Sequence, residues 1–312
     1  MFTLIWNNWL LVGLIPPLLY AIVALFDAYF VDRQIFHNAR EATMISALLG
    51  ALPLLAPASG LYDFSLPAPT VTIVAFLSGV AFAGHVYFYI AALFRRNDTV
   101  LAESIQNLSV LCVPFLAFLL IDEVLTPLHY LGIAVASLGV VFMYCYRKTA
   151  SRITFSGCGS LLISMLLFSF TLVAAEWVYQ HTSFWDGFMV FSGGMFATGV
   201  MLYLCGEKSR LPALIARRWR FFIAIEAITT VGVICSHRAV DISPSATYIA
   251  ITECLGAYFI LLLSVVVFWF SRISGKSVNV LAKICKQQLV DYPGKIIAGL
   301  FISSSIYLVY SY

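Results

Sequence analysis

Charged residues are scarce in this sequence. Asp, Glu, Lys and Arg together make up 11% of the 312 residues, whereas a typical soluble domain contains about 25%. Hydrophobic residues make up 62%, and the mean hydropathy is +0.95. Because so few polar groups cannot cover this much apolar surface in water, the composition excludes a soluble globular domain and predicts a polytopic membrane protein.

Several catalytic and nucleotide-binding patterns are also missing. The absence of GxxxxGK[ST] and of a soluble ATP-binding region argues against a primary pump. The absence of HExxH and GxSxG argues against an enzyme. The seven cysteines occur without a CxxC pair, which favours buried thiols over a metal site. The opening MFTLIWNNWLLVG has neither a basic region nor a small-residue cleavage site, so we expect a retained helix. No cofactor and no nucleic-acid partner are predicted.

Ten apolar runs remain, each long enough for a membrane helix. About 20 residues cross the ~30 Å hydrocarbon core, and helices satisfy the backbone within each run. The fold class expected is therefore all-α, with ten transmembrane helices. The runs lie near 9–31, 42–58, 70–94, 99–121, 128–146, 157–180, 187–205, 219–240, 246–270 and 293–312.

Lys and Arg are distributed unequally between the connections. Of the 18, all except Arg238 lie in or beside the odd-numbered connections. Cytoplasmic loops carry such an excess, so these connections are predicted to be cytoplasmic and both termini non-cytoplasmic, in an inner cell membrane. Two basic stretches, 208–222 and 274–292, are expected to be interfacial helices that bind anionic lipid headgroups.

The two halves of the chain, 1–150 and 151–312, resemble each other. A shift of 146 residues aligns a polar kink followed by a long helix, and a shift of 149 aligns Asp27 with Glu176. The last helix aligns only at a shift of 166, which indicates a basic amphipathic insertion at about 271–292. Because each half has five spans, the sequence predicts two inverted five-helix repeats with a site between them.

The stretch SVLCVPFLAFLLIDEVLTPLHYLGIAVASLGVVFMY, which begins at Ser109, resembles the signature of the fourth and fifth helices in the EamA-like branch of the drug/metabolite transporter superfamily. Shared features are Pro114, the acidic Glu123, the Leu-Thr-Pro that follows it and the spaced Gly132 and Gly139. The second half departs from the pattern, with Phe-Trp where the acidic pair would fall. The resemblance implies transport of small metabolites, without a particular solute.

Polar residues inside the apolar runs are the candidate site, since a charge at the centre of a helix costs about 2.5–3.5 kcal/mol. On one continuous helix, Glu103, Asn107, Val110 and Pro114 would share a face, with Gln106 adjacent. We expect Glu103, Gln106 and Asn107 to contact substrate. The alternative is that they only bond neighbouring helices.

The shift of 146 pairs Glu253 with Asn107 and Thr252 with Gln106, so Glu253 and Thr252 are also predicted to bind substrate. Glu253, Glu103 and Glu226 are the candidate proton-coupling groups. Glu226 lies near the predicted cytoplasmic side, where it could instead pair with a basic loop residue.

The remaining polar groups have two readings each. His85 and Tyr89 lie in one span and are predicted substrate contacts, although a lone histidine is often a bonded core residue. Asp27 and Glu176 lie near helix ends, where a solvated position is the simpler reading, as it is for Asp122 and Glu123. Arg238 either compensates Asp241 or binds an anionic solute.

Embedded acids outnumber embedded bases, which favours a cationic or zwitterionic amine-bearing metabolite. Aromatic rings could add cation–π contacts, the candidates being Tyr20, Tyr87, Tyr89, Trp177, Tyr248 and Tyr258. The expected protein is a secondary transporter, monomeric or homodimeric, that works by alternating access and is proton-coupled. The alternatives are a carrier or flippase for a lipid-linked or nucleotide-linked substrate and a non-transporting partner subunit.

Overall fold

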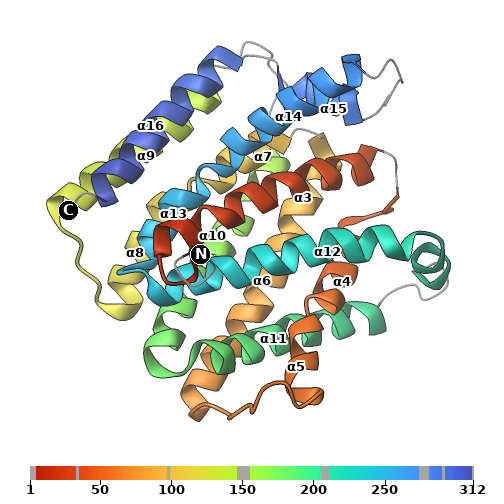
Figure 1. The fold of residues 1–312 in the computed structure, drawn as a ribbon, viewed down its shortest axis with the longest axis vertical. Coiled ribbons are helices and arrows are strands. Elements are labelled where there is room, and N and C mark those ends of the chain that lie inside the picture. The colour runs from red at the N-terminus through yellow and green to blue at the C-terminus, as the bar shows by residue number, and fades with distance from the viewer. Residues whose placement is uncertain are drawn as a thin grey trace.

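The computed structural model describes residues 5–32, 35–96, 99–145, 155–205, 211–273, 281–289 and 292–310. Helices make up most of this part of the chain, and none of its residues forms a strand. Seven helical segments are long and apolar enough to cross a membrane. The protein is therefore an all-helical, multi-pass membrane protein (Figure 1).

The first half contains α2 (Trp9–Gly13), α3 (Ile15–Asp32), α4 (Ala39–Leu49), the short η1 (Leu52–Leu54) and α5 (Leu55–Ala58), α6 (Pro69–Arg96), α7 (Thr99–Gln106), α8 (Ser109–Ile121) and α9 (Pro127–Cys145). The second half contains α10 (Phe155–His181), α11 (Phe184–Leu204), α12 (Leu211–Ile242), α13 (Ala246–Glu253), α14 (Gly256–Ile273), α15 (Leu281–Gln288) and α16 (Tyr292–Tyr310). Each of the ten apolar runs contains helix, and the three runs outside the seven long segments contain the shorter apolar helices Ser109–Ile121, Pro127–Phe142 and Ile296–Tyr310.

Two runs that the sequence presents as continuous are broken in the middle. α7 ends at Gln106 and α8 begins at Ser109, so the helix expected over 99–121 is interrupted at Asn107 and Leu108. α13 ends at Glu253 and α14 begins at Gly256, which interrupts the ninth run in the same way. The prediction that Glu103, Asn107, Val110 and Pro114 share one helix face is therefore wrong, because the turn at the break changes the register.

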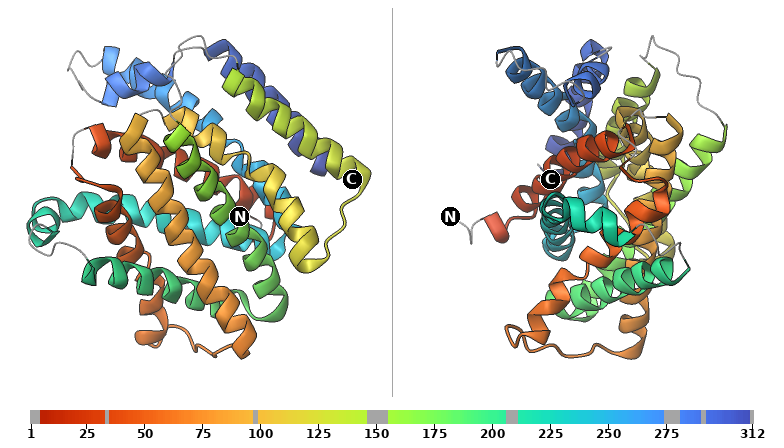
Figure 2. Two further views of the ribbon diagram at one scale, coloured as in Figure 1. Left: turned by 180° about the vertical axis from the view of Figure 1, so that it is seen from behind. Right: turned by 90° about the vertical axis from the view of Figure 1, so that its right-hand side faces the viewer.

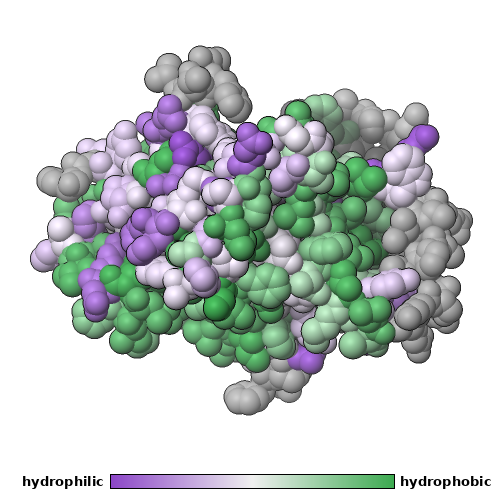
Figure 3. Space-filling view, turned by 90° about the horizontal axis from the view of Figure 1, so that it is seen from below, coloured by the Kyte–Doolittle hydropathy of each residue, from purple (hydrophilic) through white to green (hydrophobic). Residues whose placement is uncertain are grey.

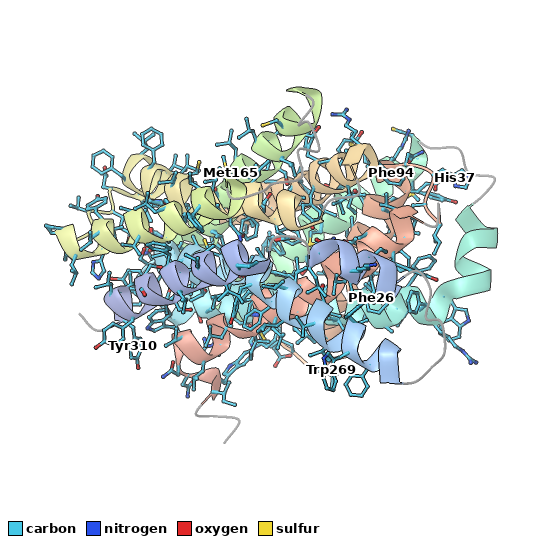
Figure 4. All side chains as sticks on the ribbon, turned by 90° about the horizontal axis from the view of Figure 1, so that it is seen from above. Phe26, His37, Phe94, Met165, Trp269 and Tyr310 are labelled. Carbon is cyan, nitrogen blue, oxygen red and sulfur yellow. The ribbon has the colours of Figure 1, made fainter. Side chains whose placement is uncertain are left out.

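The bundle has two ends that differ in their polar contacts. At one end, Arg40 donates to the Leu202 carbonyl at 3.1 Å, and Arg95 donates to the Ser160 hydroxyl at 2.9 Å. We call this the Arg40 end. At the other, the Asp186 end, the first turn of α11 contacts the loop before α6 through Asp186. Figure 4 shows His37 and Phe94 at the first end and Tyr310 toward the second.

Small residues bring several helices close together. Gly79 of α6 and Gly194 of α11 face each other so closely that a Cβ on either one would overlap a backbone carbonyl of the other helix. α9 and α16 pack side by side as a pair at the edge of the bundle (Figures 1 and 2). In that pair Gly139 leaves room for the Ala298 carbonyl. Packing is therefore the role of these glycines.

Apolar side chains also cover much of the outer surface. Leu119 is 56% exposed and Trp269 66% exposed. The space-filling view from below shows large hydrophobic areas, with hydrophilic side chains gathered over one part of that face (Figure 3). A surface of this kind is suited to contact with lipid.

The two basic stretches have different structures. The described part of 208–222, from Leu211 onward, is helical and continues into the candidate membrane span that begins at Trp219. In the second stretch, Ile284 and Cys285 of α15 are buried against α3 and α14, whereas Lys286 is exposed. Residues 274–280 and 290–291 lie outside the described part of the chain.

Candidate functional site

A cavity of about 120 Å³ lies between the two halves, among α3, α4, α6, α7, α10, α12, α13 and α14. Four of its lining residues are acids, namely Asp27, Glu103, Glu226 and Glu253. No Lys or Arg occurs among the described residues that line it. The rest of the wall combines amides, hydroxyls, one histidine and apolar or aromatic side chains. Such a wall favours a positively charged ligand, because it offers carboxylates and ring faces without competing cations.

The two helix breaks meet beside this cavity. Asn107 donates through Nδ2 to the Cys254 carbonyl at 3.1 Å, and the Cys254 thiol donates to the Asn107 carbonyl at 3.4 Å. The two residues are 147 positions apart in the sequence, and these hydrogen bonds join the first break to the second. α7 and α13 also direct their C-terminal ends here, where the helix dipole favours positive charge.

Glu103 and Glu253 each accept one hydroxyl hydrogen bond. The Tyr89 hydroxyl donates to Glu103 Oε1 at 2.6 Å, and the Ser236 hydroxyl donates to Glu253 Oε1 at 3.0 Å. A carboxylate can accept about four such bonds. Both groups therefore keep acceptor capacity that faces the cavity.

Glu226 and Asp27 lie nearer the Arg40 end. Glu226 accepts a hydrogen bond from the Ser46 hydroxyl at 3.0 Å and does not pair with a basic residue in the described chain, contrary to the loop pairing considered from the sequence. Asp27 lies within electrostatic range of both Glu226 and Glu103. The simpler sequence reading of Asp27, a solvated helix end, is wrong because the side chain lies on the cavity wall.

His85 and Gln106 share a hydrogen-bonded cluster with Ser164. The Ser164 hydroxyl contacts His85 Nδ1 at 2.9 Å and lies 3.1 Å from Gln106 Oε1. Gln106 is only 6% exposed, and its Nε2 has no hydrogen-bond partner among the described residues. A buried polar atom without a partner is costly. Rotation of the amide by 180° would let Nε2 contact Ser164 and place Oε1 where Nε2 now lies.

Some predicted contacts lie elsewhere. Thr252 is absent from the wall, and its hydroxyl donates to the Ile249 carbonyl of its own helix at 2.8 Å. Of the aromatic candidates, only Tyr20 and Tyr89 line the cavity. Tyr248 instead contacts His129 at 2.8 Å near the Asp186 end. The other predicted residues, namely Glu103, Gln106, Asn107, Glu253, His85 and Glu226, all line the cavity.

Aromatic residues form the cavity wall toward the Arg40 end. Phe30, Phe36 and Phe222 line it, and the Phe36 and Phe222 rings stack with centroids 5.5 Å apart. No sequence pattern distinguished these rings from the many other phenylalanines. They become identifiable only when α3, α4 and α12 are seen together.

The acids at the Asp186 end have different partners. Asp186 accepts hydrogen bonds from the Ser183 hydroxyl, the Tyr62 hydroxyl and the Ser65 backbone N–H, at 2.7, 3.1 and 3.0 Å. Glu176 accepts from the Ala246 N–H at the start of α13, at 2.9 Å. These bonds join loops and helix ends to one another.

Arg238 is also at this end and away from the cavity. Its guanidinium pairs with Asp241 and lies over the Trp6 and Phe184 rings. Local compensation of Asp241 is therefore the reading that the structure favours. Nearby, burial raises the pKa of Glu123 above its ordinary value, and a hydrogen bond with Ser245 partly offsets this effect.

No family model matches this sequence, and no curated protein is similar to it. Solved structures do share its fold. One crystal structure of a protein superposes with a TM-score of 0.61, over 95% of this chain and 97% of its own, at 18% sequence identity. This likeness shows that the same helical fold occurs in another protein.

Proposed function

We propose that the protein is a secondary transporter of a small amine-bearing metabolite, cationic or zwitterionic, and that it works by alternating access. The observation that carries the proposal is the cavity wall, which has four carboxyl groups and no Lys or Arg among its described residues. Buried acids of this kind are retained in membrane proteins mainly along substrate and proton paths.

The proposed architecture is ten transmembrane helices in two inverted five-helix repeats, 1–150 and 151–312. Helix in all ten runs supports it. The two helix breaks also support it, since they are 147 residues apart and bond each other. In this register Glu253 corresponds to Gln106, and Cys254 to Asn107. Broken helices that meet between repeats are a recurrent form of transporter site.

Proton coupling would use Glu103, Glu253 and Glu226. Each accepts a hydrogen bond from a neutral hydroxyl, so either a proton or a cationic substrate can neutralise it. Exchange of one for the other links the two fluxes. Alternating access follows if the apolar core that contains Phe188 and Phe191 opens in a second conformation.

Membership of the EamA-like drug/metabolite transporters remains part of the proposal. It rests on the residues around Pro114 and Glu123 and on helix in the ten runs. A carrier for an anionic, lipid-linked substrate would need cationic groups in the cavity. Arg238, the candidate for that role, is paired with Asp241 outside it. We therefore place the flippase second.

The inner membrane is the proposed location, with the Arg40 end in the cytoplasm. The arginines at that end support this orientation through the positive-inside rule. A reporter fused after the C-terminus should then be active only on the non-cytoplasmic side. Activity in the cytoplasm would invert the orientation proposed for the bundle.

The deciding experiment is pH-driven flux in vesicles that contain the purified protein. Radiolabelled amines should accumulate when a pH gradient is imposed, and Glu253→Gln should abolish the accumulation without changing the unfolding temperature. Glu41→Gln, which removes a carboxyl from the start of α4 outside the cavity, is the matched control and should retain flux. Wild-type flux in Glu253→Gln would mean that Glu253 only packs. Uptake of anions alone would favour the flippase.

A further inference from the structure

The four cavity acids are spread along the cavity. On α12, Glu226 and Ser236 are ten residues apart, which is about 15 Å along the helix axis. Ser236 binds Glu253, so Glu226 and Glu253 belong to different levels of the bundle. On α3, Tyr20 and Asp27 are seven residues apart, which is about 10 Å along the helix axis. Tyr20 contacts Ser236 and lies near Glu253, whereas Asp27 lies near Glu226.

The four acids form a row in which each interacts electrostatically with the next. Glu253 is within range of Glu103, Glu103 of Asp27, and Asp27 of Glu226. Two acids therefore lie beside the helix breaks and two lie nearer the Arg40 end. A single ammonium group reaches one of these pairs and leaves the other without a counter-charge.

Apolar side chains also line the cavity. Val23, Ala24, Val86 and Ile90 line the cavity together with the acids. Side chains of this kind contact methylene groups favourably, at about 25 cal/mol per Å² of apolar area buried. The wall thus offers both carboxyl groups at different levels and apolar surface for a hydrocarbon chain.

We infer that the cavity takes a linear aliphatic diamine or polyamine, with one ammonium beside Glu103 and Glu253, another beside Asp27 and Glu226, and the methylene chain between them. The inference rests on the proposed transport function and narrows its substrate class. A zwitterion fits less well, because its carboxylate would lie among four acids.

The test compares diamines with monoamines of matched chain length. Binding is measured by calorimetry on the detergent-purified full-length protein, with 1,n-diaminoalkanes and the corresponding 1-aminoalkanes. The best diamine should bind at least about 10-fold more tightly than its monoamine, which is the change expected from one additional ionic contact. Glu226→Gln should remove that advantage, so that the diamine and its monoamine then bind within about 2-fold of each other.

A second variant and one control keep the outcomes separate. Asp27→Asn tests the same pair if Glu226→Gln does not fold, and Glu41→Gln should behave as wild type. Equal affinity for diamines and monoamines, or a diamine advantage that survives both cavity variants, overturns the inference while amine transport stands. If no amine binds and none is transported, the result would instead contradict the proposed amine transport itself.

Discussion

Carboxylic acids occupy two regions of this protein, and the two sets have different neighbours. At the Asp186 end, Asp241 pairs with a guanidinium, Asp186 accepts bonds from three residues of two loops, and Glu176 holds the start of α13. In the cavity, Glu103 and Glu253 each accept a bond from one neutral hydroxyl. The first set is satisfied by the protein. In the transport proposal, a proton or a cationic substrate neutralises the carboxyl groups of the second set.

This difference distinguishes acids that stabilise the fold from acids that we propose bind a ligand. A carboxylate with full protein partners stabilises the loops that supply them. A carboxylate in an apolar cavity with one hydroxyl partner costs free energy until a proton or a cation arrives. Loss of an acid should therefore affect stability at one end and flux in the cavity.

The largest effect is expected for Glu103→Gln. The amide keeps the shape and an acceptor for Tyr89 but removes the charge that would contact a substrate ammonium. Loss of a buried charge pair costs about 2–5 kcal/mol, so amine flux should fall by about 30-fold or more. The unfolding temperature should stay near the wild-type value.

Flux in reconstituted vesicles and thermal unfolding in detergent provide the two readouts for Glu103→Gln. Tyr89→Phe is the companion variant, since it removes the hydroxyl and leaves the carboxyl in place. It should reduce flux less than Glu103→Gln does. A large loss of stability in Glu103→Gln with normal flux would move this acid into the structural set.

Asp186→Ala should show the opposite pattern. It leaves the Ser65 N–H and the Tyr62 hydroxyl without their acceptor and frees the loop before α6. We expect a loss of about 1–3 kcal/mol in the free energy of unfolding and unchanged amine affinity. Denaturant unfolding measures the first and calorimetry the second. Weakened binding in a folded variant would show that this end contributes to the site.

The smallest effect concerns Glu123 and pH. Its folded-state pKa is raised by burial, so the folded chain holds this proton more tightly than the unfolded chain does. The stabilisation is present below the ordinary carboxyl pKa and is lost as the pH rises through the raised value. Glu123→Gln should flatten this fall, by less than about 1 kcal/mol. Unfolding curves from pH 4 upward, in about one-unit steps, would show it. An unchanged slope would mean that Glu123 has no part in the pH response.

The positions of the helices could be predicted because the contrast between apolar runs and basic connections is strong. The faces of these helices that point into the bundle could not be predicted. Helices that are apolar nearly all round show no periodic stripe from which an interior side can be read. Asp27 and Thr252 illustrate the result. Asp27, which was assigned to a solvated helix end, lines the cavity. Thr252, which was assigned to the site, donates to a carbonyl of its own helix.

The broken helices explain a second limit. Neither Asn107–Leu108 nor Cys254–Leu255 contains proline or glycine, and the local signal was limited to Gly256, which follows the second break. Each break depends on the other through contacts between residues 147 positions apart. The sequence shift of 146 pairs Glu253 with Asn107, whereas an alignment of the two breaks has a shift of 147 and pairs Glu253 with Gln106. The transport roles of these residues remain predictions.

The reciprocal bond between Asn107 and Cys254 also has a consequence for biosynthesis. At about 5–20 residues per second, a ribosome needs roughly 7–30 seconds to make the 147 residues that separate them. During that time the first break exists in the membrane without its bonding partner. The nascent first half thus passes through a state in which Asn107 lacks its bonds to Cys254, and the insertion machinery has to accommodate this polar side chain until the second half arrives.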